Sequence, residues 1–138
     1  MRKFLSANIS QSGTSFALFV LRISAAALMV PHGYDKLAHF SNMKANFMSF
    51  MGLGSAFSLA LVIFAEFFCS LMLAAGMLTR FVAIPLIITM AVAVFKAHKG
   101  DIFGDGQFPF LLMMVFFVLL ITGPGKISVD NSLFKTRR

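Results

Sequence analysis

The residues best placed to do chemistry are two charges inside strongly apolar segments. Arg22 stands in the segment 16–37, and Glu66 stands in the segment 56–78. A charge in the middle of a membrane helix costs about 2.5–3.5 kcal/mol on the insertion scale, so such a residue turns away from lipid and marks a functional site by default. At about 1.5 Å of rise per residue, Arg22 lies about 9 Å from the end of its helix and Glu66 about 18 Å from the same end of the neighbouring helix. We therefore predict an ion pair between Arg22 and Glu66; its alternative role is only to fix the register of the two helices.

Further polar residues gather where the first apolar segment ends. Arg22, Gly33 and Lys36 fall on one helical stripe, and the missing side chain of Gly33 leaves a notch that a partner helix or a ligand could approach. His32 flanks this stripe, and His98 ends the third apolar segment on the same side of the membrane. The alternative for the two histidines is a hydrogen bond to backbone or water at the membrane interface. We predict a buried polar pocket with the Arg22–Glu66 pair as its floor, formed by Arg22, His32, Gly33, Lys36, Glu66 and His98.

The same part of the sequence argues against a metal or haem centre. Axial haem ligation needs two histidines on facing helices, and nothing places His32 and His98 in that way. Asp101 and Asp105 stand among glycines, but their spacing is not that of a calcium loop. We expect neither a bound metal ion nor haem.

Composition fixes the class of protein. Of the 138 residues, 59% are hydrophobic and 12% are charged, and the mean hydropathy is +0.88. A water-soluble domain of this size could not bury so much apolar surface. The net charge of +7 comes from basic residues at the ends of apolar segments, where they anchor to lipid head groups, and they form no stripe that would bind nucleic acid. We predict an integral membrane protein whose partner is the lipid bilayer and not a nucleic acid.

Four apolar segments define the predicted fold. A spanning helix needs about 20 residues, with a range of about 17–25, so the shorter third segment could instead be re-entrant. Between the first two spans, apolar residues at helical spacing from Ser41 to Gly52 predict a helix that lies in the membrane interface. The alternative is that these apolar residues simply pack over the bundle. We predict an all-α integral membrane four-helix bundle with a short interfacial helix between spans 1 and 2. It forms a single domain over residues 1–138, with its spans at 16–37, 56–78, 81–97 and 107–123.

Lysines and arginines near the helix ends predict the orientation. Seven lie on the side that holds both termini: Arg2, Lys3, Arg80, Lys126, Lys135, Arg137 and Arg138. Four lie on the other side: Lys36, Lys44, Lys96 and Lys99. The positive-inside rule therefore places both termini in the cytoplasm.

Several motifs in this order give the chain a resemblance to a known family. They are Arg22 in the first span, "HGYDK" (32–36), Glu66 in the second span, "GMLTR" (76–80) and "GPGKISVD" (123–130). From about residue 18 to residue 130 the sequence resembles the DoxX family of small four-helix bacterial membrane proteins. The resemblance implies a bundle in the bacterial inner membrane and structural roles for the motif residues Gly76, Thr79, Arg80, Gly123, Pro124, Gly125 and Asp130.

The resemblance also implies a functional context. The family is related to DoxD, a subunit of an archaeal thiosulfate to quinone oxidoreductase, and other relatives are linked to membrane oxidoreductase or oxidative-stress complexes. Relatives often carry an acidic residue at the start of the fourth span, whereas this chain has Gln107, Phe108 and Pro109 there.

Three functions remain open from the sequence. The first is an accessory or quinone-associated subunit of a membrane oxidoreductase, which would act as an enzyme only within that complex because the chain has no redox centre of its own. The second is a membrane scaffold without chemistry, and the third is a small proton-coupled transporter that uses Glu66. The first implies redox partner subunits and a quinone ligand, and a homo-oligomer is compatible with all three.

Overall fold

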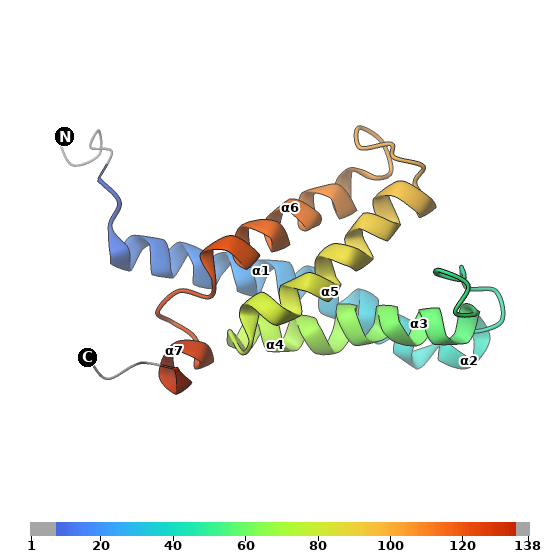
Figure 1. Cartoon of the computed structure of the whole chain (residues 1–138), viewed down its shortest axis with the longest axis horizontal. Coiled ribbons are helices and arrows are strands. Elements are labelled where there is room, and N and C mark those ends of the chain that lie inside the picture. The colour runs from blue at the N-terminus through green and yellow to red at the C-terminus, as the bar shows by residue number, and fades with distance from the viewer. Residues whose placement is uncertain (1–7, 135–138) are drawn as a thin grey trace.

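The structure, a computed structural model, describes residues 8–134, and these residues form helices and connecting turns without a strand. Two connections are longer than the others, the segment 44–54 between α2 and α3 and the segment 98–106 between η2 and α6. In chain order the helices are α1 (Gln11–Ala38), α2 (Phe40–Met43), α3 (Ser55–Ile63), the π-helical turn η1 (Phe64–Cys69), α4 (Ser70–Ala75), α5 (Thr79–Val92), the π-helical turn η2 (Ala93–Ala97), α6 (Gln107–Thr122) and α7 (Val129–Leu133) (Figure 1).

Within residues 8–134, three continuous helices are long and apolar enough to cross a membrane: Gln11–Ala38, Ser55–Ala75 and Thr79–Ala97. A fourth apolar helix, Gln107–Thr122, is shorter. These helices begin and end close to the predicted segments, except that α1 begins at Gln11 and not at residue 16. The earlier start has a local cause, because the hydroxyl of Ser10 accepts a hydrogen bond from the backbone N–H of Gly13 and caps the helix.

The long helices pack with alternating direction. α1 lies along η1 and α4, and α5 packs against α6 as a helical hairpin. The bundle has two ends. The terminal end is where α1 begins and α6 finishes. The loop end is where α1 finishes and α3 begins. Figure 1 shows the α5–α6 hairpin diverging from α3 toward the loop end. The core between the helices consists of Leu18, Ala25, Met29, Cys69, Leu73, Val82, Leu86, Met90, Leu112, Phe116 and Leu119.

The predicted interfacial helix is much shorter than expected. Only the four residues of α2 are helical, and the chain then runs through turns and bends to Gly54. Met51, Gly52 and Gly54 have positive φ angles of 51°, 75° and 88°, which a helix does not allow. In addition, the hydroxyl of Ser58 accepts a hydrogen bond of 2.8 Å from the backbone N–H of Phe50. This side-chain hydrogen bond holds the segment against α3.

The fourth apolar helix ends where the sequence has a glycine followed by a proline. α6 ends at Thr122, and Gly123 follows with a φ of 77° that favours glycine. Pro124 has no backbone N–H with which to continue the helix.

Part of the orientation prediction falls outside the described residues. Five of the basic residues that it counts lie there: Arg2, Lys3, Lys135, Arg137 and Arg138.

Candidate functional site

A cavity of about 490 Å³ lies between α3–η1 and α5–η2 near the loop end. Its volume falls in the range of about 300–1,000 Å³ that is typical of small-molecule sites. Phe47 and Phe50, from the segment between α2 and α3, close it on one side, and most of the other lining residues are apolar. Two of its lining residues, Phe64 and Ile88, are also 51% and 49% exposed, so the cavity is open to the outer surface of the helices.

A charged pair lies on the wall of this cavity. Nζ of Lys36 donates to Oε2 of Glu66 at 2.5 Å, and the two side chains are 21% and 7% exposed. Helical side chains tilt toward the N-terminus of their helix, so Lys36 in the last turn of α1 reaches back toward Glu66. An ammonium has three donors and a carboxylate two acceptor oxygens, so the pair retains hydrogen-bonding capacity for a ligand.

Gly33 allows α1 to touch the backbone of η1 beside this pair. A Cβ on Gly33 would lie 2.5 Å from the backbone nitrogen of Phe67 and 2.7 Å from the carbonyl carbon of Glu66. Real Cβ atoms essentially never come so close to backbone, so only glycine fits here. The predicted notch at Gly33 is confirmed, and it brings Lys36 within reach of Glu66.

This contact gives a first prediction. Replacing Gly33 with alanine is expected to push α1 away from η1 and to lower the free energy of unfolding by about 1–3 kcal/mol, as overpacked cores do. The measurement is the unfolding midpoint of the purified protein in mild detergent, followed by circular dichroism.

Gly13, in the same helix, provides the matched control. A Cβ there would meet its nearest neighbour at an ordinary 3.5 Å, so Gly13→Ala should be neutral or slightly stabilising because alanine favours helix. If both variants unfold at the same midpoint, the close contact between α1 and η1 does not exist.

The prediction of an Arg22–Glu66 ion pair is wrong. Arg22 is fully buried and lies near the terminal end, where its guanidinium donates to the carbonyl oxygens of Leu73 at 3.2 Å and of Ala74 at 3.0 Å, and to that of Ile127. Two of these carbonyls belong to the last turn of α4, where helical carbonyls lack partners within the helix. Arg22 therefore caps the C-terminus of the second long helix, where a cation is also favoured by the helix dipole.

Side-chain direction explains the exchange of partners. The side chain of Arg22 tilts toward the start of α1, which leads it to the terminal end and away from Glu66. The same tilt brings Lys36 from the loop end toward Glu66, so the carboxylate pairs with the lysine. The charges that were expected to form one site thus belong to two sites at opposite ends of the bundle.

The family-like motifs meet around Arg22. The carboxylate of Asp130 accepts hydrogen bonds from the backbone N–H groups of Leu78 at 2.7 Å and Thr79 at 2.9 Å. It therefore caps the start of α5. The backbone N–H of Asp130 donates to the carbonyl of Gly76 at 2.9 Å. These bonds attach the segment that follows α6 to the turn between α4 and α5.

Glycines keep this region compact. Gly76 has a φ of 70° and ends α4 in the left-handed conformation, and a Cβ there would collide with the guanidinium of Arg22. Gly125, which follows Pro124, packs against the backbone of Ser15 in α1. Arg80 is exposed and donates to the carbonyl of Ile121 at 3.2 Å, next to Gly123. The residues predicted from the family motifs therefore form a structural cap at the terminal end.

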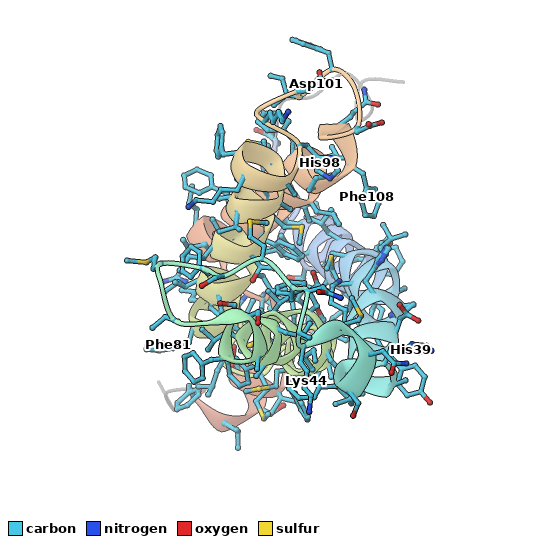
Figure 2. The ribbon with its side chains drawn as sticks, turned by 90° about the vertical axis from the view of Figure 1, so that its right-hand side faces the viewer. His39, Lys44, Phe81, His98, Asp101 and Phe108 are labelled. Carbon is cyan, nitrogen blue, oxygen red and sulfur yellow. The ribbon has the colours of Figure 1, made fainter. Side chains whose placement is uncertain are left out.

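The two histidines lie outside the cavity. His32 is exposed on α1, and its ring lies 5.9 Å from the ring of Phe108. His98 follows η2, and its backbone N–H donates to the carbonyl of Ala93. Viewed onto the loop end, Figure 2 shows His98 and Phe108 in the upper half of the molecule and His39 and Lys44 in the lower half. Of the six residues predicted to form one pocket, Lys36 and Glu66 line the cavity and Gly33 positions them.

Sequence reasoning missed two polar residues of the cavity, Ser58 and Thr89. The hydroxyl of Ser58 also donates to the carbonyl of Gly54 at 2.6 Å, which holds the segment carrying Phe47 and Phe50 over the cavity. Both residues are polar and stand inside apolar segments, and this signal could have identified them. A hydroxyl group inside an apolar segment is a much weaker indication of a functional site than a charged group there.

Comparison with known proteins places this geometry in a family. A sequence model of the DoxX family matches residues 17–99, which cover the cavity, the Lys36–Glu66 pair and Arg22. The chain belongs to the DoxX family. This DoxX protein is 26% identical over 121 residues to a Bacillus subtilis protein named "Putative oxidoreductase CatD", across 86% of this chain and 88% of the relative.

A second relative is less informative about function. A Haemophilus influenzae protein that is named only as uncharacterized is 29% identical over 130 residues, across 87% of this chain and 92% of the relative. No solved structure matches the chain with significance. Family membership and the long apolar helices together make this a DoxX-family membrane protein.

Proposed function

We propose that the protein is a four-span bundle in the bacterial inner membrane with both termini in the cytoplasm, and that it serves as a quinone-binding accessory subunit of a membrane oxidoreductase. The observation that carries the proposal is the cavity, because its walls are apolar and aromatic while the Lys36–Glu66 pair supplies polar groups at one point. A quinone has the same division between an apolar ring and tail and two carbonyl oxygens.

The chemistry of the pair supports this ligand class. A quinone carbonyl accepts hydrogen bonds, and the ammonium of Lys36 has N–H donors beyond the one that it gives to Glu66. The carboxylate holds the amine of Lys36 in position in an apolar setting, where an unpaired charge is costly. The name of the Bacillus subtilis relative supports the oxidoreductase context.

Both π-helical turns contribute residues to the cavity. Glu66 and Phe64 belong to η1, and Ala93 and Ala97 belong to η2. π-helical turns are rare and occur frequently at functional sites. Their position on two facing helices supports a binding role for this cavity rather than for the cap at the terminal end.

The proposal is tested by quinone binding to the purified protein in lipid nanodiscs. Equilibrium dialysis with a short-tailed ubiquinone or menaquinone analogue should give saturable binding, and Ala93→Phe, which fills the cavity, should weaken it by at least about tenfold, equal to about 1.4 kcal/mol. Ala27 is exposed on α1 and lies outside the cavity, so Ala27→Phe should bind as the unmodified protein does.

Two results would contradict the proposal. One is equal binding by the Ala93→Phe and Ala27→Phe variants, which would mean that the cavity is not the site. The other is the absence of a redox subunit when the protein is isolated from its native membrane in mild detergent, which would remove the accessory role.

A further inference from the structure

The amine of Lys36 stands in surroundings unlike those of the other lysines near the loop end. Lys44, Lys96 and Lys99 are exposed, whereas Lys36 lines the apolar cavity and within residues 8–134 its Nζ has Glu66 as its hydrogen-bond acceptor. A lysine amine attacks a carbonyl compound once a neighbouring base has taken its proton, and the carboxylate of Glu66 lies within hydrogen-bond reach of Nζ to do so. The hydrogen bonds proposed for a quinone do not require a nucleophilic amine at Lys36.

The geometry allows the proton of the pair to move. Nζ and Oε2 are 2.5 Å apart, so a proton passes between them along one hydrogen bond, and the result is a neutral amine and a neutral acid. Glu66 can therefore release the lone pair of Lys36 and keep the proton nearby.

From this arrangement we propose that Lys36 binds long-chain aldehydes covalently, as a Schiff base. The nitrogen attacks the carbonyl carbon, the carbonyl oxygen takes a proton from Glu66, and Glu66 takes one from the nitrogen, which gives a carbinolamine. Glu66 then protonates the hydroxyl group, which leaves as water. The product is a protonated imine beside the Glu66 carboxylate, and the sum is one ammonium plus one aldehyde giving one iminium plus one water, with no oxidant or reductant.

The cavity determines which aldehydes fit. Phe47, Phe50 and Phe64 provide apolar and aromatic walls, and the exposed rim at Ile88 lets a hydrocarbon tail continue into the acyl chains of the membrane. Apolar walls offer water few hydrogen-bond partners, which disfavours hydrolysis of the imine. The ligand class is thus an aldehyde group at the end of a long apolar chain, and Glu66 is the counter-ion of the imine.

This inference goes beyond the proposed function and does not depend on it. A quinone would be held by hydrogen bonds to the same amine, so an aldehyde bound to Lys36 should block quinone binding. The two ligands therefore compete for one position although they use different chemistry.

The test uses the full chain in nanodiscs with two probes, hexadecanal and all-trans-retinal. After incubation, borohydride reduces any imine to a stable amine, and peptide mass spectrometry of the unmodified protein locates it. We expect the label at Lys36 with either probe. Bound retinal should also show the red-shifted absorbance of a protonated imine.

Three variants sharpen the result. Lys36→Arg keeps the positive charge and a partner for Glu66 but has no primary amine, so labelling should fall by at least about tenfold because this reaction needs an amine. Lys44→Arg, at an exposed lysine outside the cavity, should label as the unmodified protein does. Glu66→Gln removes the carboxylate that stabilises the protonated imine, so any remaining retinal imine should be unprotonated and lack the red shift.

The outcomes separate this inference from the quinone proposal. Labels spread equally over Lys36, Lys44, Lys96 and Lys99, or unchanged labelling in Lys36→Arg, would overturn the aldehyde site. No label at Lys36 together with intact quinone binding overturns the aldehyde site alone. A label at Lys36 without quinone binding overturns the proposed function alone.

Discussion

Replacing Arg22 with methionine is expected to lower the free energy of unfolding by about 3 kcal/mol or more, because each hydrogen bond to a charged group contributes about 1.5–3 kcal/mol. The fully buried guanidinium donates to carbonyls of Leu73, Ala74 and Ile127 and so joins three segments of the chain. Methionine fills most of the volume, so the loss reports the hydrogen bonds and not a cavity. Denaturant unfolding in mild detergent, followed by circular dichroism, measures it.

Arg80 is the matched control for this experiment. It lies at the same end of the bundle and also donates to a helix-terminal carbonyl, that of Ile121, but it is exposed. Arg80→Met should therefore change the free energy of unfolding by no more than about 0.5 kcal/mol, as surface substitutions usually do. Equal effects of the two substitutions would show that Arg22 does not cap α4 as described.

The long helices could be predicted from the sequence because the rule behind them is simple. A chain in lipid must satisfy its backbone hydrogen bonds within helices, so length and hydropathy locate the helices within a few residues. The close contact at Gly33 could also be predicted, because a small residue on the stripe of Arg22 and Lys36 indicates that another helix approaches there. Both predictions depend on local pattern alone.

The partner of Arg22 could not be obtained from depth along the membrane alone. The estimate of depth relies on the length of the arginine to cover the difference from Glu66. Helical side chains instead tilt toward the N-terminus, so Arg22 and Lys36 point the same way along α1. With the backbone of Gly33 fixed against Phe67, this rule assigns Lys36 to Glu66 and leaves Arg22 for the end of α4. The missing information was the register between two helices, which only tertiary contact sets.

The cavity was the least predictable feature. It depends on the divergence of α5 from α3 and on the irregular segment that carries Phe47 and Phe50. That segment was expected to be a helix, because its apolar residues have helical spacing. The hydroxyl of Ser58 and the positive φ angles of Met51 and Gly54 give it another course, and such competition between side-chain hydrogen bonds and helix is not visible in periodicity.

The Lys36–Glu66 pair gives the second large prediction, a double-mutant cycle. Lys36→Leu alone should lower the free energy of unfolding by about 3–5 kcal/mol, because it leaves a buried carboxylate without its partner. Glu66→Leu alone should cost less, about 1–3 kcal/mol, because the longer lysine can extend its ammonium toward the loop end. The double replacement should restore most of the loss, since an apolar pair packs well where a buried ion pair stood.

Ligand binding separates a working site from a pair that only fixes helix register. Stability of the double variant is measured by denaturant unfolding in detergent, and its quinone binding by dialysis in nanodiscs. If the pair recognises a ligand, the double variant should fold nearly as well as the unmodified protein and yet bind the quinone analogue at least about tenfold more weakly, equal to about 1.4 kcal/mol. Unchanged binding by a well-folded double variant would leave the charges with a structural role alone. Purely additive losses in stability would show that the two side chains do not interact, because a contacting pair gives a coupling energy of about 0.5–3 kcal/mol.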